Sequence, residues 1–305
     1  MEMQHHLFAT RFIIFLIITF VHVPSSTFAK DDEQYVNCGN LFDCGDIKGA
    51  GYPFWGSNRP DYCGYPAFKL DCSDQDPEIT IQKLTYKVLG INNQSQILSV
   101  ARKDHAENNL CPTLLLNTTW IPNILRYTSD DQNITIYYGC PAQGAPPSHY
   151  SSQFPCTINS TAMTGYFTAI SNLSVYGSSA SSLISYLASC KHSIEVPVRG
   201  SAQQKILSTP TVTQLLEGLN EGFDFVWSAN DASCETCQLS GGRCGYNQTT
   251  AAFSCYCKDQ PRKLSCPNSP PEAQSPTEDQ SPSMSSCLLL FFSADVTLEV
   301  NRKTA

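Results

Sequence analysis

The sequence predicts a mainly β protein with a few short helices, organised as two disulfide-rich extracellular modules. Three observations support this fold class. The N-terminus has the features of an export signal, and fourteen cysteines follow between Cys38 and Cys266. Several segments rich in β-branched and aromatic residues are separated by Gly, Pro and Asn turns, which is typical of short strands. The 305 residues allow about two domains.

Residues 1–29 are expected to form a signal peptide. Arg11 precedes an apolar run at 12–21, and small residues stand before a cut after Ala29, as export signals require. The run is too short to cross a bilayer, which takes about 20 apolar residues. A buried N-terminal helix is the alternative, but the cleavage pattern favours export. We therefore expect the chain to be secreted.

Export determines how the cysteines are interpreted, because thiols pair as disulfides in an oxidising compartment. The fourteen cysteines between Cys38 and Cys266 predict seven bridges, and Cys287 is the odd cysteine. The expected disulfide cysteines are Cys38, Cys44, Cys63, Cys72, Cys111, Cys140, Cys156, Cys190, Cys234, Cys237, Cys244, Cys255, Cys257 and Cys266. Six N-glycosylation sequons agree with secretion and predict exposed positions: Asn93, Asn117, Asn133, Asn159, Asn172 and Asn247.

Local patterns predict several individual elements. The dense Gly and Pro punctuation between Cys38 and Cys72 predicts turns and short extended pieces, not helix. Strands are expected at 79–81, 84–89, 97–100, 134–140, 165–175 and 222–227, the first three forming a hairpin. Short helices are expected at 182–187 and 211–219, the second capped by Thr211 or Thr213.

The last six cysteines of the second module are closely spaced, from Cys234 to Cys266. Their pattern, C-x2-C-x6-C-x10-C-x-C-x8-C, resembles at its end an EGF-like module. That resemblance implies the bridges Cys234–Cys244, Cys237–Cys255 and Cys257–Cys266, although six cysteines leave other connectivities open. A zinc site is disfavoured behind a signal peptide. Residues 267–305 are rich in Ser and Pro and are expected to be a disordered tail.

The segments between the cysteines resemble a known plant family. Residues 34–111, with Phe42-Asp-Cys44-Gly45, Tyr52-Pro53-Phe54 and Cys63-Gly-Tyr-Pro-Ala-Phe68, resemble the galacturonan-binding domain of wall-associated receptor kinases. Residues 133–266 resemble the wall-associated-kinase C-terminal module, for example at Gly222-Phe-Asp-Phe-Val-Trp227 and Phe253-Ser-Cys-Tyr-Cys257. The order of the two modules is similar to that in ectodomains of leaf-rust-resistance-type receptor-like kinases.

The resemblance implies a cell-wall ectodomain that binds pectin or oligogalacturonide, in a family of single-pass plasma-membrane proteins. It also implies a transmembrane helix and a Ser/Thr kinase, and the sequence shows neither an apolar span nor the kinase signatures. We therefore expect no enzyme activity. Three explanations for the missing transmembrane helix and kinase remain open: a soluble decoy, a splice product and a truncated gene model.

Charge and composition argue against other functions. The formal net charge of −8 and the pI of about 5.2 disfavour nucleic acid, which requires a basic surface. Without residues 1–29 only His105, His149 and His192 remain, and no hydrolase signature is present. A secreted glycoside hydrolase would need paired carboxylates. The densest acidic cluster is Asp71, Asp74, Asp76 and Glu78, which a solvated loop also explains.

Carbohydrate binding would use aromatic rings that stack on sugars and cations that attract uronic acids. Residues 30–110 carry eight Lys and Arg against twelve Asp and Glu, so a polyanionic ligand requires a local basic cluster or bridging calcium. The alternatives are that the rings fill the core, that the cations are ordinary surface charges, and that the module binds a protein or peptide ligand. The candidate carbohydrate-binding residues are Tyr52, Phe54, Trp55, Arg59, Tyr62, Lys69, Arg102 and Lys103, with Tyr65 and Phe68 as further rings.

Overall fold

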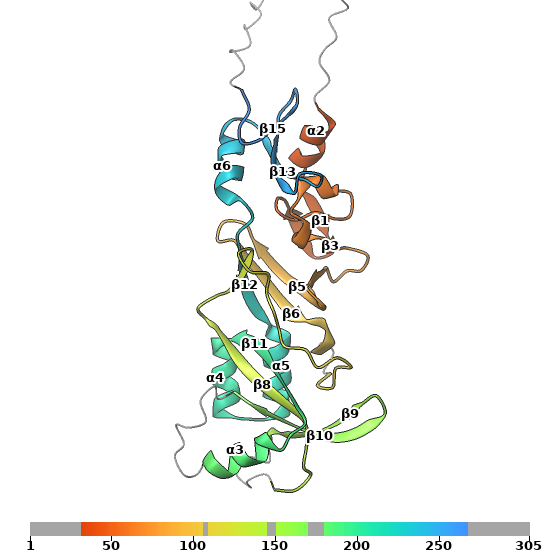
Figure 1. Ribbon diagram of the computed structural model, residues 1–305, viewed down its shortest axis with the longest axis vertical. Coiled ribbons are helices and arrows are strands. Elements are labelled where there is room, and N and C mark those ends of the chain that lie inside the picture. The colour runs from red at the N-terminus through yellow and green to blue at the C-terminus, as the bar shows by residue number, and fades with distance from the viewer. Residues whose placement is uncertain (1–31, 106–108, 145–150, 170–179, 268–305) are drawn as a thin grey trace, which may run out of the picture. The chain divides into compact units, whose positions relative to one another are not determined.

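The computed structural model describes residues 32–105, 109–144, 151–169 and 180–267 (Figure 1). These residues form a mainly β structure with five short α-helices and seven disulfides, which confirms the predicted fold class. Three predictions lie outside the described residues: the signal peptide at 1–29, the sequon at Asn172, and the tail beyond Pro267 with Cys287. The strand expected at 165–175 lies outside them from residue 170 on, and its first part coincides with the end of a strand that ends at Thr168.

The N-terminal segment contains more helix than the sequence predicted. A short helix, α2 (Glu33–Gly39), begins at Asp32, whose carboxylate accepts the backbone N–H groups of Gln34 and Tyr35. This is an N-cap in which a side chain satisfies donors that lack a partner inside the helix. Cys38 lies in the last turn, so the expectation that this region avoids helix was wrong there. The remaining short elements are β1 (Phe42–Cys44), β2 (Ile47–Ala50), η1 (Asp61–Cys63) and η2 (Pro66–Phe68).

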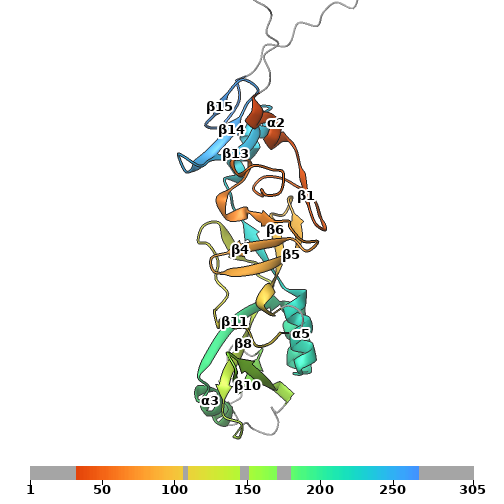
Figure 2. The ribbon, with the colours of Figure 1, turned by 90° about the vertical axis from the view of Figure 1, so that its right-hand side faces the viewer.

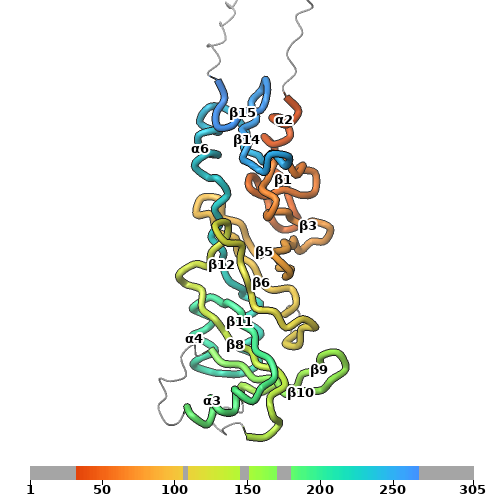
Figure 3. The backbone as a smooth tube through the Cα atoms, in the orientation of Figure 1, coloured from red at the N-terminus to blue at the C-terminus, as the bar shows by residue number. Residues whose placement is uncertain are grey.

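The largest sheet has six strands, and one of them comes from far along the chain. Strand β12 lies between β6 and β7, with Phe225 opposite Leu98 on one side and Tyr127 on the other. Figure 3 shows this late segment among the early strands. The predicted hairpin and the strand at 222–227 are both confirmed. In sheet order the strands are β3 (Leu70–Asp71), β4 (Glu78–Ile81), β5 (Leu84–Asn92), β6 (Ile97–Arg102), β12 (Phe223–Trp227) and β7 (Leu125–Tyr127).

An aromatic core joins the N-terminal segment to this sheet. Phe54 packs edge-to-face on Phe68, with ring centroids 5.3 Å apart, and on Trp227, at 5.1 Å. Phe223 and Phe225 alternate with half-buried residues along β12 and bury their rings beside Tyr86. Such ring pairs add about 0.5–1.5 kcal/mol each to the energy of burial. Residues near both ends of the described chain therefore stabilise one core.

A second sheet of four strands lies between β7 and β12 in the chain, and two helices pack against it (Figure 2). Helix α5 is capped by Thr211, whose hydroxyl accepts the N–H of Gln214, so the predicted helix and the first of its two candidate caps are confirmed. Leu215 and Leu219 of α5 pack in the core with Ile136 of the sheet. The elements are β11 (His192–Arg199), β8 (Asp131–Cys140), β10 (Thr161–Thr168), β9 (Gln153–Ile158), α3 (Ala180–Ala188), α4 (Gly200–Ser208) and α5 (Val212–Glu221).

A polar network connects the two sheets. Arg199, at the end of β11, donates to Asp224 of β12, with the closest nitrogen and oxygen 3.0 Å apart. Ser99 of β6 donates to the same carboxylate at 2.5 Å. Asp131 accepts the backbone N–H of Asp224 with one oxygen and both the N–H and the hydroxyl of Thr128 with the other. Since these bonds involve charged groups, they hold the sheets together more strongly than neutral ones.

The last described segment is a cysteine-rich unit of a small sheet and a helix. Its three bridges are Cys234–Cys244, Cys237–Cys255 and Cys257–Cys266, the connectivity that the EGF-like ending implies. The helix that carries the first two cysteines was not predicted. The elements are α6 (Asp231–Leu239), β13 (Arg243–Asn247), β14 (Ala252–Tyr256) and β15 (Pro261–Arg262). The unit packs on the N-terminal segment, where the Tyr256 hydroxyl donates to the carbonyl of Tyr62 at 3.2 Å.

Candidate functional site

The eight candidate carbohydrate-binding residues do not form one cluster on the surface. Phe54, Arg59 and Arg102 are buried, with 0%, 4% and 2% of their surfaces exposed. A ligand outside the protein does not reach them in this structure, so their burial gives these three candidates no support as ligand contacts. Their positions in the core follow from the aromatic packing and from the hydrogen bonds described next.

Arg59 holds the N-terminal segment together from within. Its guanidinium donates to the carbonyls of Phe54 at 3.2 Å, Cys38 at 3.2 Å and Cys63 at 3.2 Å, and also to that of Asn40. No carboxylate of the described residues pairs with it, and burial lowers its pKa to about 10. Because Cys38 and Cys63 are joined by a disulfide, the guanidinium and the bridge fix the same turn.

Arg102 has a similar internal role at the end of β6. It pairs with Asp104 through two nitrogens, at 3.0 and 2.6 Å, and donates to the Leu116 carbonyl at 2.8 Å and the Thr118 hydroxyl at 3.2 Å. This fork geometry is the bidentate pairing that arginine forms with carboxylates. Arg102 therefore anchors the segment after Cys111 to the sheet.

Tyr52 and Tyr62 connect the N-terminal segment to the cysteine-rich unit. The Tyr52 hydroxyl donates to the carbonyl of Ala229, and its ring packs edge-to-face on Phe253 at 6.0 Å. Burial raises the pKa of Tyr52, so the hydroxyl stays protonated and able to donate. Tyr62 accepts the side-chain N–H of Asn37 at 2.7 Å. Both rings are half-buried, so packing occupies most of their surface.

Trp55 and Lys69 are the candidates that the structure places together at the surface. The backbones of the two residues form an isolated parallel bridge, and the Lys69 ammonium lies 5.5 Å from the centre of the indole ring. The indole N–H donates to the Tyr65 carbonyl at 2.9 Å, which fixes the ring. Trp55 is half-buried and Lys69 is exposed. The pair thus combines a fixed aromatic face with a cation.

Lys103 and the acidic cluster neutralise each other in part. Lys103 pairs with Glu78, and this contact raises the pKa of the lysine. Lys87 pairs with Asp76 at 2.7 Å. By contrast, Lys69 forms no ion pair with any residue that the structure describes. Of these three lysines, Lys69 is therefore the one without an ion pair, although its charge also acts on Asp71, whose pKa is lowered mainly by hydrogen bonds from Ser73.

Three surface hollows provide a geometric test of the hydrolase hypothesis. The hollows measure about 400, 850 and 720 Å³, and within the described ranges only Asp231 contributes a carboxylate to any of their linings. A pair of carboxylates is needed for glycoside hydrolysis. His105 is buried, with its Nε2 atom unpartnered and its pKa lowered by burial to about 4. These three hollows and His105 therefore give no support to the hydrolase hypothesis.

Sequence reasoning missed the second of these hollows because it searched for a basic cluster only in residues 30–110. The hollow of about 850 Å³ is lined by Phe253, Arg262 and Lys263 of the cysteine-rich unit. Adjacent basic residues at 262–263 between two cysteines were the available signal. A count of charged residues in each segment of the sequence would have detected this basic pair.

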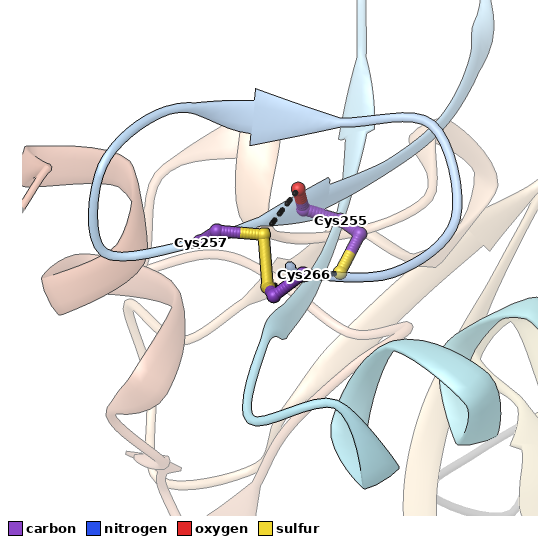
Figure 4. Close-up of side chains that lie close together, drawn as sticks. All are labelled: Cys255, Cys257 and Cys266. Carbon is purple, nitrogen blue, oxygen red and sulfur yellow. Dashed lines mark hydrogen bonds between the residues drawn. A yellow bond between two sulfur atoms is a disulfide. The ribbon is translucent and has the colours of Figure 1, made fainter. Parts of the chain in front are cut away.

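Three cysteines of this unit have sulfur atoms within 4.8 Å of one another (Figure 4). Such a cluster resembles a metal site, but each sulfur already belongs to a bridge: Cys255 pairs with Cys237, and Cys257 pairs with Cys266. Disulfide sulfurs do not provide the thiolate that metals bind. The cluster is the crossing point of two disulfides.

The sequons in the described residues are consistent with glycosylation but do not test it. All five asparagines are exposed: Asn93, Asn117, Asn133, Asn159 and Asn247. Asn247 accepts the N–H groups of Thr249 and Thr250 through its carbonyl oxygen, at 2.9 and 3.0 Å. Occupancy of these positions stays a prediction.

The disulfides, the mainly β fold and the exposed Trp55–Lys69 pair define a class, that of disulfide-rich extracellular binding modules. Two family models match the chain. The wall-associated receptor kinase galacturonan-binding family matches residues 38–102, and the wall-associated receptor kinase C-terminal family matches residues 155–260. Both resemblances expected from the sequence are confirmed.

Curated relatives from Arabidopsis thaliana narrow the assignment. The leaf rust 10 disease-resistance locus receptor-like protein kinase-like 2.1 is 32% identical over 85% of this chain and 40% of its own length. The kinase-like 2.8 protein is 32% identical over 75% of this chain and 25% of its own. The kinase-like 1.3 protein is 27% identical over 78% and 31%. The chain is similar to the ectodomains of this receptor-like kinase family, and the two family models match its two ectodomain modules.

The chain spans 40% or less of the length of these relatives. The described residues contain no kinase domain and no helix that is both long and apolar enough to span a bilayer. No solved structure is significantly similar to this chain. The family and the disulfide-rich fold fit an extracellular location.

Proposed function

We propose that this ectodomain binds acidic cell-wall polysaccharide, pectic galacturonan in particular, through the surface at Trp55 and Lys69. The observation that carries the proposal is the position of this pair inside the segment matched by the galacturonan-binding family, at 38–102. Galacturonan offers what the pair can recognise, a C–H face for the indole and a carboxylate for the ammonium.

Local structure makes the pair rigid. Trp55 donates its backbone N–H to Phe68 and accepts one from Leu70, so it is paired with the segment around Lys69 as one strand is with its neighbour. Gly64 lies against the indole, where an added Cβ would be 2.6 Å from the ring carbon Cδ1. A preorganised ring binds without the entropy cost of ordering it.

The charge balance explains why an acidic ligand can approach an acidic protein. Lys87 and Lys103 are engaged with Asp76 and Glu78, whereas Lys69 has no ion pair among the described residues and can meet the ligand. Calcium bridging is a further way to offset repulsion between the uronates and Asp71 or Asp74. Binding that strengthens with calcium would identify this contribution.

The test is binding of the secreted, glycosylated protein to oligogalacturonides, with and without calcium, beside neutral xylan and glucan. Lys69→Gln should weaken binding about tenfold, because a hydrogen bond to a charged group contributes roughly 1.5 kcal/mol or more. Trp55→Leu should weaken it further. Lys83→Gln is the matched control, since Lys83 is an exposed lysine of the same module at the β4–β5 turn.

Two results would contradict the proposal. One is equal affinity for acidic and neutral glycans, which leaves no role for the ammonium. The other is saturable binding that neither substitution weakens. If no glycan binds at all, a protein or peptide ligand becomes the favoured alternative.

A further inference from the structure

The groove of about 850 Å³ in the cysteine-rich unit has no assigned role. It is lined by residues of α6, β13, β14 and β15 and of the segments beside them, among them Ser233, Phe253, Arg262 and Lys263. These residues lie outside the galacturonan-binding match at 38–102 and apart from the Trp55–Lys69 pair. Its volume is within the range of small-molecule sites, about 300–1,000 Å³.

The charge of the groove indicates the class of ligand. Arg262 and Lys263 line it, and no carboxylate does. Asp259 pairs with the Arg262 guanidinium at 2.7 Å but is not part of the lining. The side-chain oxygen of Gln260, in its swapped amide orientation, also accepts from Arg262. These two acceptors use only part of the five N–H donors of a guanidinium, so they orient Arg262 and leave it able to bind an anion.

An aromatic ring gives the groove a face for a sugar. Phe253 is half-buried and lies edge-to-face against Tyr52, which fixes one side of the ring. Phe253 also lines the groove. Ser233 of α6, which carries a hydroxyl, is a further lining residue. Ring, cations and hydroxyl together suit an acidic sugar rather than a simple anion.

The other hollows are less suitable for the same ligand. The hollow of about 720 Å³ shares Ser233 but contains Asp231 and no Lys or Arg, so it would repel a carboxylate. The hollow of about 400 Å³ is smaller and includes one lysine, Lys191, beside apolar Ile184 and Leu187. Charge and size therefore both favour the groove of the cysteine-rich unit.

We propose that this groove is a second binding site for acidic oligosaccharide, formed by the C-terminal module and separate from the Trp55–Lys69 surface. The choice of ligand class rests on the proposed function, whereas the location rests on Phe253, Arg262 and Lys263. Two sites on one ectodomain would let a long polyuronate bind with higher avidity than a short one.

Lysine footprinting tests both sites in one experiment. The glycosylated protein is acylated with a lysine-selective reagent, with and without oligogalacturonate, and each lysine is quantified by mass spectrometry. Lys263 should lose reactivity severalfold on ligand addition. Lys258 is the control, because it is exposed in the same unit and does not line the groove. Protection of Lys69 by oligogalacturonate in the same experiment tests the proposed function independently.

The outcomes separate the two proposals. Protection of Lys69 without Lys263 overturns the second site and leaves the first. Protection of Lys263 without Lys69 overturns the proposed Trp55–Lys69 site and leaves the second site. Protection of neither lysine overturns both proposals. As a second measurement, the double variant Arg262→Gln, Lys263→Gln should weaken binding of a long oligogalacturonate about tenfold, while Lys258→Gln leaves it unchanged. Equal affinity of the two variants overturns the second site.

The glycan predicted at Asn247 is the competing occupant, because Asn247 also lines the groove. If this glycan fills the groove, Lys263 will be unreactive without ligand and will become reactive in Asn247→Gln. That result would overturn the proposal. Full reactivity of Lys263 in both proteins, followed by protection with oligogalacturonate, supports it.

Discussion

Replacement of Arg59 by methionine should destabilise the protein without a direct effect on ligand contact. The guanidinium is 4% exposed and donates to four backbone carbonyls. Burial lowers its pKa to about 10, so at neutral pH it stays charged. The pKa of Arg59 is lower in the folded protein than in a free arginine, so burial of the charged guanidinium lowers the free energy of unfolding. This cost is present at neutral pH and is relieved only when the pH rises through about 10. The hydrogen bonds must therefore supply the stabilisation.

The size of the effect follows from the number of acceptors. Three of the four carbonyls belong to buried residues, Cys38, Phe54 and Cys63. A buried acceptor left without a donor costs about 1–3 kcal/mol, so three of them cost about 3–9 kcal/mol, and removal of the buried charge offsets part of this loss. We expect Arg59→Met to lose about 3–5 kcal/mol of unfolding free energy. For a protein of this size that corresponds to a fall in Tm of about 6–20 °C.

Thermal and denaturant unfolding, followed by tryptophan fluorescence, measure this loss. Arg59→Lys, which keeps a charge and three donors, should recover part of it. Arg126→Met removes an exposed arginine and should stay within about 0.5 kcal/mol. The reasoning is refuted if Arg59→Met unfolds like the wild-type protein. It is refuted also if the variant is fully stable but no longer binds oligogalacturonide, since Arg59 would then be a ligand contact.

Two further substitutions test the cysteine-rich unit and the junction between the sheets. Gly242→Ala would place a methyl carbon 2.4 Å from the Cys255 sulfur and should cost about 1–3 kcal/mol, with free thiols appearing in the purified protein. Gly90→Ala, where the nearest atom is 3.9 Å away, is the control, and equal stability of the two variants would contradict the packing. Burial raises the pKa of Asp224, but hydrogen bonds from Arg199 and Ser99 together with the charge of Arg199 outweigh it and lower the pKa, so its stabilisation is lost as the pH falls below about 4. Asp224→Asn should lose about 1–2 kcal/mol at pH 6 and show a flatter acid limb, and an unchanged limb would disprove the linkage.

Helices and strands whose residue pattern is visible within a short stretch of sequence could be predicted from the sequence. The hairpin of β4 to β6 follows from β-branched and aromatic residues with a turn between them, and α5 follows from an apolar stripe behind Thr211. Helices α2 and α6 were missed because tertiary contacts stabilise them. Each holds cysteines in bridges, Cys38 in α2 and Cys234 and Cys237 in α6, and such constraints override weak propensity.

The candidate site was predicted less well for a different reason. Sequence shows that Arg59 and Arg102 are charged but not that turns and bridges surround them with carbonyls and a carboxylate. Both were therefore assigned to the surface, where most arginines lie. Trp55 and Lys69 are fourteen positions apart, and only their backbone bridge brings the ring and the ammonium together. That contact depends on the fold.

The path of β12 links the two proposed binding surfaces to a single core. Its residues Phe225 and Trp227 pack with the N-terminal rings, and Trp227 directly contacts Phe54, the residue before Trp55. A few residues later α6 begins and supplies Ser233 to the groove of the cysteine-rich unit. Tyr52, three residues before Trp55, packs on Phe253 of that groove. Rigid aromatic contacts therefore connect the backbone of each surface to the other, so a substitution in β12 should disturb both sites together.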